Sequence, residues 1–255
     1  MQVNVVSDVH ASADALRTAG DGADVFICLG DLVLFVDYDD YSAGILPDLF
    51  GVEAASHYIS MRSALRFDEA RAFSKTLWDS LDRDRGEVIE EAIRAQYAAL
   101  FDAMPTPAYV TYGNVDVPRL YDEYVHDGIT VLDGQTVEIG GRTFGFVGGG
   151  LKTAMNTPFE ISDEDYAAKV AAVGAVDVLC CHIPPALPLL TYDVVGRRFE
   201  RGSEALIDAI RDTQPELVLF GHVHNPLSRR ARIGRSECVN VGHFRGLSEP
   251  YVLRW

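Results

Sequence analysis

Short runs of apolar residues recur along this chain of 255 residues, and each run stops abruptly at polar residues. Continuous runs of this kind, rich in Val, Ile and Leu, are typical of strands that are buried on both faces of a sheet. Helical or loop segments follow the runs, so we predict an α/β fold. Five of the predicted strands are followed within two residues by a His, an Asp or an Asn: 3–6, 25–29, 108–112, 176–181 and 217–220.

A long segment between residues 36 and 104 exceeds the length of a simple crossover between two strands. Phe73, Leu77 and Leu81 recur at every fourth residue, and apolar residues at helical spacing continue to Phe101. The later half predicts a crossover helix. The earlier half, at about 36–84, predicts a helical insertion or small cap after the second strand, with Gly86 as a candidate boundary.

The second half of the chain predicts further strands and one helix. Residues 129–150 alternate between apolar and polar side chains around Gly140-Gly141, which favours an antiparallel hairpin. Ser162 with Asp165 is typical of a capping box, so we expect a helix to about Val173. Residues 227–255 predict two or three more strands.

Charge and cysteine content narrow the function classes. The net charge of −16 argues against binding to nucleic-acid backbone, but metal ions in an acidic pocket can still bind a small phosphorylated substrate. The four cysteines lack C-x-x-C spacing and predict buried thiols. The chain begins with a strand-like run and has no apolar stretch of membrane-spanning length, so we expect a cytoplasmic location.

The polar residues at the strand ends form the strongest pattern. In open α/β sheets, functional groups collect beyond the carboxyl ends of the strands, so we expect these side chains to lie together. They offer oxygen and imidazole donors without thiolates, are too many for one tetrahedral zinc, and suit two ions such as manganese, iron or zinc. The predicted ligands are Asp8, His10, Asp31, Asn114, His182, His222 and His224.

The order of these motifs, D-x-H, G-D, G-N, H and G-H-x-H, resembles the calcineurin-like metallophosphoesterases. The resemblance runs from Asp8 to at least His224, and the insertion at about 36–84 lies outside it. It implies a four-layer α/β/β/α sandwich of two mixed sheets, with a dinuclear centre of divalent or mixed-valence ions at their edge. We therefore expect residues 1–255 to form one metallophosphoesterase domain that carries the insertion.

The resemblance also implies a role for each ligand. Asp8, His10 and His224 would hold the first ion, whereas Asn114, His182 and His222 would hold the second. Asp31 would bridge the two ions, since a carboxylate offers two oxygens. Asn114 would also contact the substrate phosphate through its amide. The implied reaction is hydrolysis of a P–O bond by attack of a metal-bound hydroxide.

One departure from the family bears on the substrate. Many members have G-N-H followed by an acid, where the histidine helps to protonate the leaving oxygen, but this chain has Gly113-Asn114-Val115-Asp116. A similar loss occurs in a branch of the family associated with phosphodiesters. We therefore favour a small phosphodiester, with a phosphomonoesterase or a phosphatase of proteins or nucleoside polyphosphates as alternatives. A non-catalytic binding scaffold on this fold is a further alternative, although such scaffolds can lose ligands and this chain keeps every one.

A histidine late in the chain offers a substitute for the lost proton donor. The family often has an Asn-x-Gly-Ser turn near the metals, and this chain has His243 at the serine position of "NVGHF". We hypothesise that His243 approaches the substrate as a catalytic donor. The alternative is a packed or surface histidine in a turn. Gly148-Gly149-Gly150 could let the backbone approach a phosphate, but without a P-loop Lys-Ser/Thr a tight turn is the simpler interpretation.

Overall fold

The five apolar runs that carry polar residues at their ends are β-strands, as predicted. The computed structural model describes residues 1–255. It divides into two units, Met1–Leu32 with Leu100–Trp255, and Val33–Ala99. The five strands all lie in the first unit: β1 (Gln2–Val6), β2 (Val25–Cys28), β3 (Ala108–Val110), β9 (Val178–Cys181) and β12 (Leu217–Phe220).

Two mixed sheets form the first unit. A five-stranded sheet has the order β15-β1-β2-β3-β4, and a six-stranded sheet has the order β13-β14-β12-β9-β6-β5. The other strands of these sheets are β4 (Ile129–Val131), β5 (Gln135–Ile139), β6 (Arg142–Val147), β13 (Arg230–Ile233), β14 (Ser236–Asn240) and β15 (Tyr251–Arg254). Two small sheets pair β7 (Gly150–Leu151) with β8 (Glu160–Ile161) and β10 (Tyr192–Asp193) with β11 (Arg198–Phe199).

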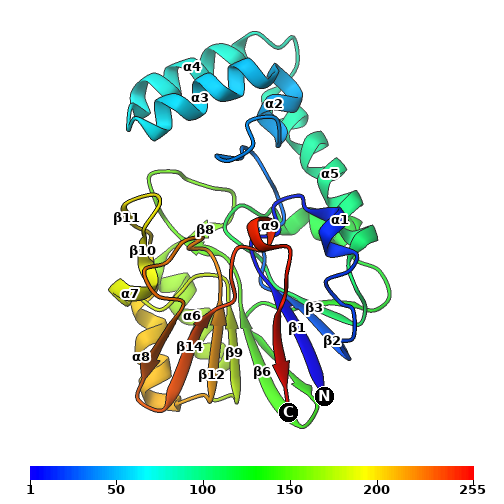
Figure 1. Ribbon diagram of the computed structural model, residues 1–255, viewed down its shortest axis with the longest axis vertical. Helices are drawn as coiled ribbons and strands as arrows, with labels where there is room; N and C mark the ends of the chain where they lie inside the picture. Colours follow the sequence, from blue (N-terminus) through cyan, green and yellow to red (C-terminus); the bar gives the residue numbers. More distant parts are fainter. The chain divides into compact units, whose positions relative to one another are not determined.

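The two large sheets pack face to face around an apolar core. Val5 and Ile27 from the five-stranded sheet belong to one buried cluster with Phe144, Val178 and Leu219 from the six-stranded sheet. Neighbouring residues along the same strands point to the outer faces, because side chains alternate along a strand. The sandwich thus has an apolar interior that holds the two sheets in fixed relation. Figure 1 shows the sheets side by side.

Helices cover the outer faces of the sandwich. On the six-stranded sheet, α6 (Asp163–Val173) and α8 (Glu204–Thr213) bury Tyr166 and Ile207 in one cluster with Phe220. On the five-stranded sheet, α1 (Ala13–Leu16) leads into a loop where the carbonyl of Ala19 accepts a bond from Asn4 of β1 (2.8 Å). The chain therefore has the four-layer α/β/β/α arrangement that the motifs predicted. The remaining short helices of this unit are the 3₁₀ helix η1 (Pro118–Glu123), α7 (Pro188–Thr191) and α9 (Phe244–Leu247).

The predicted hairpin and capping box are confirmed, with one difference. β5 and β6 pair antiparallel, and Gly140 and Gly141 between them both have positive φ (57° and 77°), which suits a tight hairpin turn. The hydroxyl of Ser162 accepts from the backbone N–H of Asp165 (3.0 Å) and begins α6. The stretch 129–131 is not part of the hairpin, because β4 pairs parallel with β3 in the other sheet.

The second unit is helical. It contains α2 (Ile45–Phe50), α3 (Val52–Ser63), α4 (Phe67–Asp79) and most of α5 (Arg85–Ala103). Inside it, Trp78 packs against Phe50 (ring centroids 5.0 Å apart), and the Gln96 side chain bonds both backbone groups of Leu34. Gly86 does not separate the helices. The break lies at 80–84, because the Asp84 carboxylate accepts from the N–H of Glu87 (3.0 Å) at the start of α5.

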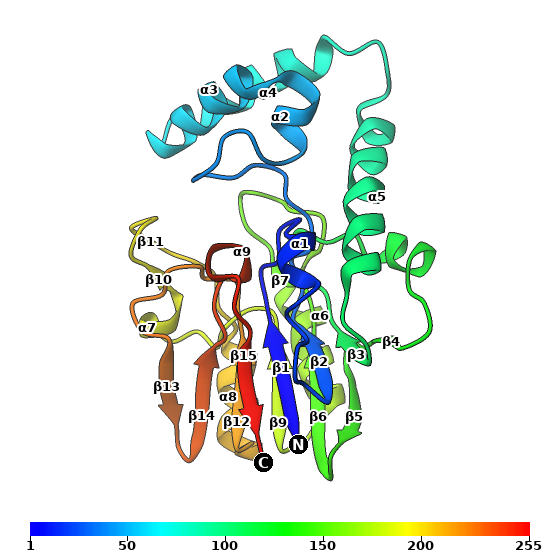
Figure 2. The same ribbon diagram turned by 45° about the vertical axis from the view of Figure 1, so that its right-hand side comes forward.

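The sheet topology brings the five polar strand ends to one edge. β1, β2 and β3 run parallel to each other, and so do β9 and β12. Figure 2 shows these strands rising from the edge that holds both chain termini towards the opposite edge. The loops that follow the five strands therefore meet.

No helix combines the length and the apolar composition that a bilayer crossing requires.

Gly145 of β6 tests the packing of a helix on the six-stranded sheet. A Cβ at this position would lie 2.2 Å from Val173 Cγ1 at the end of α6. We expect Gly145→Ala to lower the free energy of unfolding by about 1–3 kcal/mol, since overpacking a filled interior forces the helix outwards. Urea denaturation of the metal-free protein measures the change. Gly196→Ala is the control, because its nearest neighbour lies at 3.4 Å, and equal losses in both variants would contradict the packing.

Candidate metal centre

Several predicted ligands occupy a backbone conformation that side chains rarely adopt. Asp8, His10, Asp31 and His222 have φ values of 58°, 43°, 56° and 65°. Each such non-glycine residue costs of order 1–3 kcal/mol, and such residues cluster at functional sites. The strain falls on the loops directly after β1, β2 and β12. No direct signal of it is present in the sequence, because Asp and His also occur in ordinary loops.

Backbone hydrogen bonds hold these strained loops together. The N–H of Asp8 donates to the carbonyl of Gly30 (3.0 Å), and the N–H of His10 donates to the carbonyl of Asp31 (2.9 Å). These bonds join the loops after β1 and β2. The N–H of His222 donates to Asp8 Oδ2 (2.9 Å), which ties the loop after β12 to the other sheet. The site therefore spans both sheets.

The glycines of the G-N and G-H motifs allow the loops to approach closely. A Cβ on Gly113 would lie 2.0 Å from Asp31 Oδ1, and a Cβ on Gly221 would lie 2.2 Å from Asp8 Oδ2. Real Cβ atoms do not approach other atoms this closely, so only glycine lets both carboxylates take their places. In each motif, the glycine leaves room for a carboxylate from another loop, and the residue directly after the glycine is itself a predicted ligand.

Three acceptor atoms converge around His182, which is fully buried. Its Nδ1 lies 3.0 Å from the carbonyl of Leu29, so Nδ1 carries a proton and donates it to that oxygen. The opposite nitrogen, Nε2, faces Asn114 Oδ1 (3.1 Å) and Asp31 Oδ2 (3.3 Å). A backbone carbonyl that orients a histidine in this way is common where the histidine binds a metal ion.

A second convergence lies around Asp8. Asp8 Oδ1 is 3.5 Å from His224 Nε2, which in turn is 3.3 Å from His10 Nε2. The ligand atoms of Asp8, His10 and Asp31 lie within 4.8 Å of one another. The same limit holds for the trio of Asp31, His182 and His222. Asp31 is therefore the residue that the two clusters share.

The buried charges of the site require positive partners. Burial disfavours the charge on Asp31, yet His182 lowers the pKa of this carboxyl, and His224 does the same for the pKa of Asp8. Burial likewise opposes a charge on His182, but Asp31 raises the pKa of this imidazole to about 9. Without a metal ion, these buried carboxylates therefore depend on the neighbouring imidazoles for positive charge. This donor set of carboxylate, amide and imidazole groups fits divalent metal ions.

The acid that follows Val115 supports the backbone of the site. The fully buried Asp116 carboxylate accepts from the N–H groups of Asp31 (2.9 Å), Leu32 (2.9 Å) and Gly113 (2.8 Å). Burial and the charge of Asp31 raise the pKa of Asp116 to about 6. The sequence alone did not indicate a role for Asp116. Its one signal is that the acid is retained although the neighbouring histidine of the motif is replaced by Val115.

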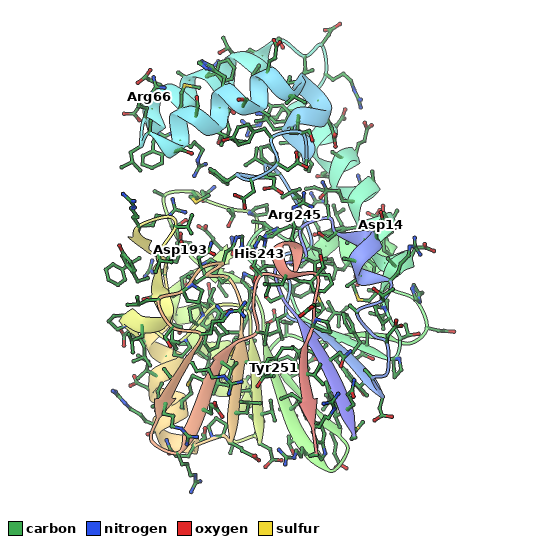
Figure 3. All side chains as sticks on the ribbon, in the orientation of Figure 1. Asp14, Arg66, Asp193, His243, Arg245 and Tyr251 are labelled. Carbon is green, nitrogen blue, oxygen red and sulfur yellow. The ribbon has the colours of Figure 1, made fainter.

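The last predicted site residue, His243, lies beside His10 and His224, next to the cluster around Asp8. It directly precedes α9, and its ring stacks on His224 with centroids 3.8 Å apart and planes at 6°. The ligand atoms of His10, His224 and His243 also lie within 4.8 Å of one another. Figure 3 labels His243 at the edge of the sheets where the loops meet. The Arg245 guanidinium in the same helix donates to the carbonyl of His10 (3.0 Å).

Asn240 is a further residue whose role the sequence alone did not indicate. Its side-chain amide donates to the carbonyls of Gly221 (3.2 Å) and Val223 (2.9 Å), and its Oδ1 accepts from the N–H of Gly242 (2.8 Å). These bonds fix the G-H-V-H loop from β14. The Asn-x-Gly part of "NVGHF" thus shapes the loop that carries His222 and His224.

Replacing Asp116 tests whether its hydrogen bonds to the backbone of Asp31, Leu32 and Gly113 support the metal site. Asp116→Asn keeps the shape but replaces one accepting oxygen by an NH₂ group that faces backbone donors. We expect Mn²⁺ affinity to fall about 10–100-fold, because the loop of Asp31 loses its anchor. Isothermal titration of the metal-free protein measures this, with Asp24→Asn at an exposed acceptor for Gln2 N–H as control. Unchanged affinity in Asp116→Asn would rule out the anchoring role.

Comparison with solved structures agrees with the fold. Two solved crystal structures have the same fold, one at TM-score 0.59 and 15% identity, covering 99% of this chain and 98% of that chain. The other, TT1561 of Thermus thermophilus, has TM-score 0.54 and 14% identity over 99% of this chain and 98% of that one. No curated protein sequence matches the chain significantly.

A family model described as calcineurin-like phosphoesterase matches residues 79–226. The match includes Asn114, His182 and the G-H-V-H motif. Asp8 and Asp31 precede the matched residues, and the fold brings both of them into the same site. The family supports metal-dependent hydrolysis of phosphate esters, and the earlier resemblance is confirmed. The chain belongs to the calcineurin-like phosphoesterase family.

Proposed function

We propose that this protein is a dinuclear metal-dependent phosphoesterase that acts on a small phosphodiester. The observation that carries the proposal is the position of Asp31. Its carboxylate belongs to one cluster with Asp8 and His10 and to another with His182 and His222. One carboxylate shared between two sets of ligands favours a bridge between two ions.

The ligands divide between the two ions as follows. Asp8, His10 and His224 would hold the first ion, and Asn114, His182 and His222 would hold the second. Asp31 would contact both. When bound, the ions would lower the pKa of a water molecule and spread the charge that develops on the phosphoryl group. Manganese, iron and zinc all suit a site of nitrogen and oxygen donors without thiolates.

Three residues beside the ions define the part that the protein plays in the reaction. Asn114 would present Oδ1 to the second ion, and one amide hydrogen of this residue would orient a phosphate oxygen of the substrate. Val115 has no side-chain donor, and its backbone N–H already donates to Asp31 Oδ1 (2.9 Å). His243, beside His10 and His224, would donate a proton to the leaving oxygen in place of the lost histidine.

The preference for a diester rests on the apolar side chain of Val115 and on the branch of the family that shares it. The alternatives are a phosphomonoesterase and a phosphatase of proteins or nucleoside polyphosphates. A binding scaffold has less support, because every predicted ligand is present and either lies in the clusters or bonds to them. The four cysteines are buried and unpaired, which supports a cytoplasmic location.

Rates on paired substrates test the proposal. With Mn²⁺ restored to the chelated protein, we expect faster hydrolysis of an aryl phosphodiester than of the matching phosphomonoester. Asp31→Asn should abolish both rates, because it weakens the bridge and both ion sites together. Initial rates of aryl alcohol release provide the measurement.

Other outcomes separate the alternatives. A faster monoester rate that also requires Asp31 would support the phosphatase and reject the diesterase. Two bound ions without turnover of either ester would reject activity on simple aryl esters. A protein that binds no metal and hydrolyses neither ester would support the scaffold.

His243→Ala tests the proton donor. We expect turnover of diesters with poor leaving groups to fall by about 10²–10⁴, whereas an activated aryl ester needs no protonation and should keep its rate. His126→Ala is the control, because His126 precedes β4 and so lies at the opposite edge of the sheet. Equal losses on both esters, or a lower content of bound metal, would show that His243 does not act as the donor.

A further inference from the structure

The segment 153–160 forms hydrogen bonds with both the backbone and the side chain of Asn114. The N–H of Phe159 donates to the carbonyl of Asn114 (2.9 Å), and Asn114 Nδ2 donates to Thr157 Oγ1 (3.0 Å). Because Asn114 follows β3 in one sheet and the segment follows β7, these bonds are long-range contacts. They surround a predicted ligand of the second ion.

The triple glycine, Gly148-Gly149-Gly150, makes these hydrogen bonds to Asn114 possible. A Cβ on Gly150 would lie 2.7 Å from Asn114 Cβ, and Gly149 has φ +86° and lies close to Phe159. The N–H of Gly150 donates to the carbonyl of Phe159 (3.0 Å). Gly149 and Gly150 thus allow the backbone to pass close to Asn114. This gives the triple glycine a structural role that the proposed phosphoesterase reaction does not require.

Thr157 is itself held by an acid. Its hydroxyl donates to Glu160 Oε1 (2.9 Å), and Glu160 also accepts from Thr153 Oγ1 (2.7 Å) and from the Thr153 N–H (2.7 Å). An ionised carboxylate can only accept hydrogen bonds, so the single hydroxyl proton of Thr157 is committed to Glu160. Thr157 Oγ1 can then act towards Asn114 only as an acceptor.

This polarity selects one orientation of the Asn114 amide. The NH₂ group must face Thr157, so Oδ1 must face His182 Nε2, where the distance is 3.1 Å. The opposite orientation would turn the NH₂ group towards the ligand atoms of the second ion. It would also leave two acceptors, Asn114 Oδ1 and Thr157 Oγ1, facing each other.

We propose that Thr157, held by Glu160, is a positioning residue that fixes the Asn114 amide with Oδ1 towards the second ion and one N–H towards the substrate. The inference deepens the proposed function and rests on its assignment of Asn114 as a ligand. Outer partners that orient a metal ligand typically contribute 10–100-fold to metal affinity. Thr157 thus acts through Asn114, without contacting an ion.

Mn²⁺ titration of the metal-free protein tests the inference without reference to activity. We expect Thr157→Val to weaken binding of one ion about 10–100-fold and to leave the other ion within about twofold of wild type. Thr157→Ser should restore wild-type affinity, because it keeps the hydroxyl. Thr213→Val is the matched control, since it removes a hydroxyl that donates to the Ala209 carbonyl within α8.

The outcomes separate this inference from the proposed function. Wild-type protein that binds two ions, with Thr157→Val unchanged, would overturn the positioning role alone. An equal loss in Thr157→Ser would also overturn it, because the hydroxyl would then not be the cause. Wild-type protein that binds no second ion would overturn the proposed dinuclear site. If Thr157→Val does not fold, Glu160→Gln must give the same selective loss for the inference to stand.

Discussion

Two buried carboxylates, Asp8 and Asp31, determine how the rest of this site is built. Both are almost completely inaccessible to water. A buried carboxylate is costly unless hydrogen bonds and positive partners stabilise its charge. The N–H of His222 binds Asp8, and the N–H of Val115 binds Asp31. The imidazoles of His182 and His224 supply the opposite charge. The loops of both sheets are thus arranged around two anions, and this arrangement attracts cations.

The two sheets contribute different parts to this arrangement. The five-stranded sheet provides both carboxylates and Asn114, whereas the six-stranded sheet provides His182, His222 and His224. A filled apolar core fixes the distance between the sheets, so the oxygen and nitrogen donors are held in place before any ion arrives. Preorganisation of this kind lowers the free-energy cost of binding a metal ion. Hydrogen bonds from Asp116, Asn240 and Thr157 also hold individual loops of the site in place.

The sequence predicted the parts of the structure that depend on periodicity and motif order. The buried strands, the hairpin at Gly140-Gly141 and the helix after Ser162 follow from local patterns, and parallel topology then gathers the strand ends. Asp116, Asn240 and Thr157 could not be predicted in the same way. Their roles depend on hydrogen bonds between segments distant in sequence, as in the contact between Thr157 and Asn114. The stretch 129–131 was assigned to the hairpin because alternation does not reveal which sheet a strand joins.

The left-handed backbone at Asp8, His10, Asp31 and His222 has an evolutionary consequence. At each of these positions glycine would adopt the same conformation without strain, so selection for stability alone would favour glycine. A lineage released from catalysis would gain stability by drifting to glycine at these sites. This chain instead has Asp, His, Asp and His there. Side chains at such strained positions are expected where their chemistry matters more than a relaxed backbone.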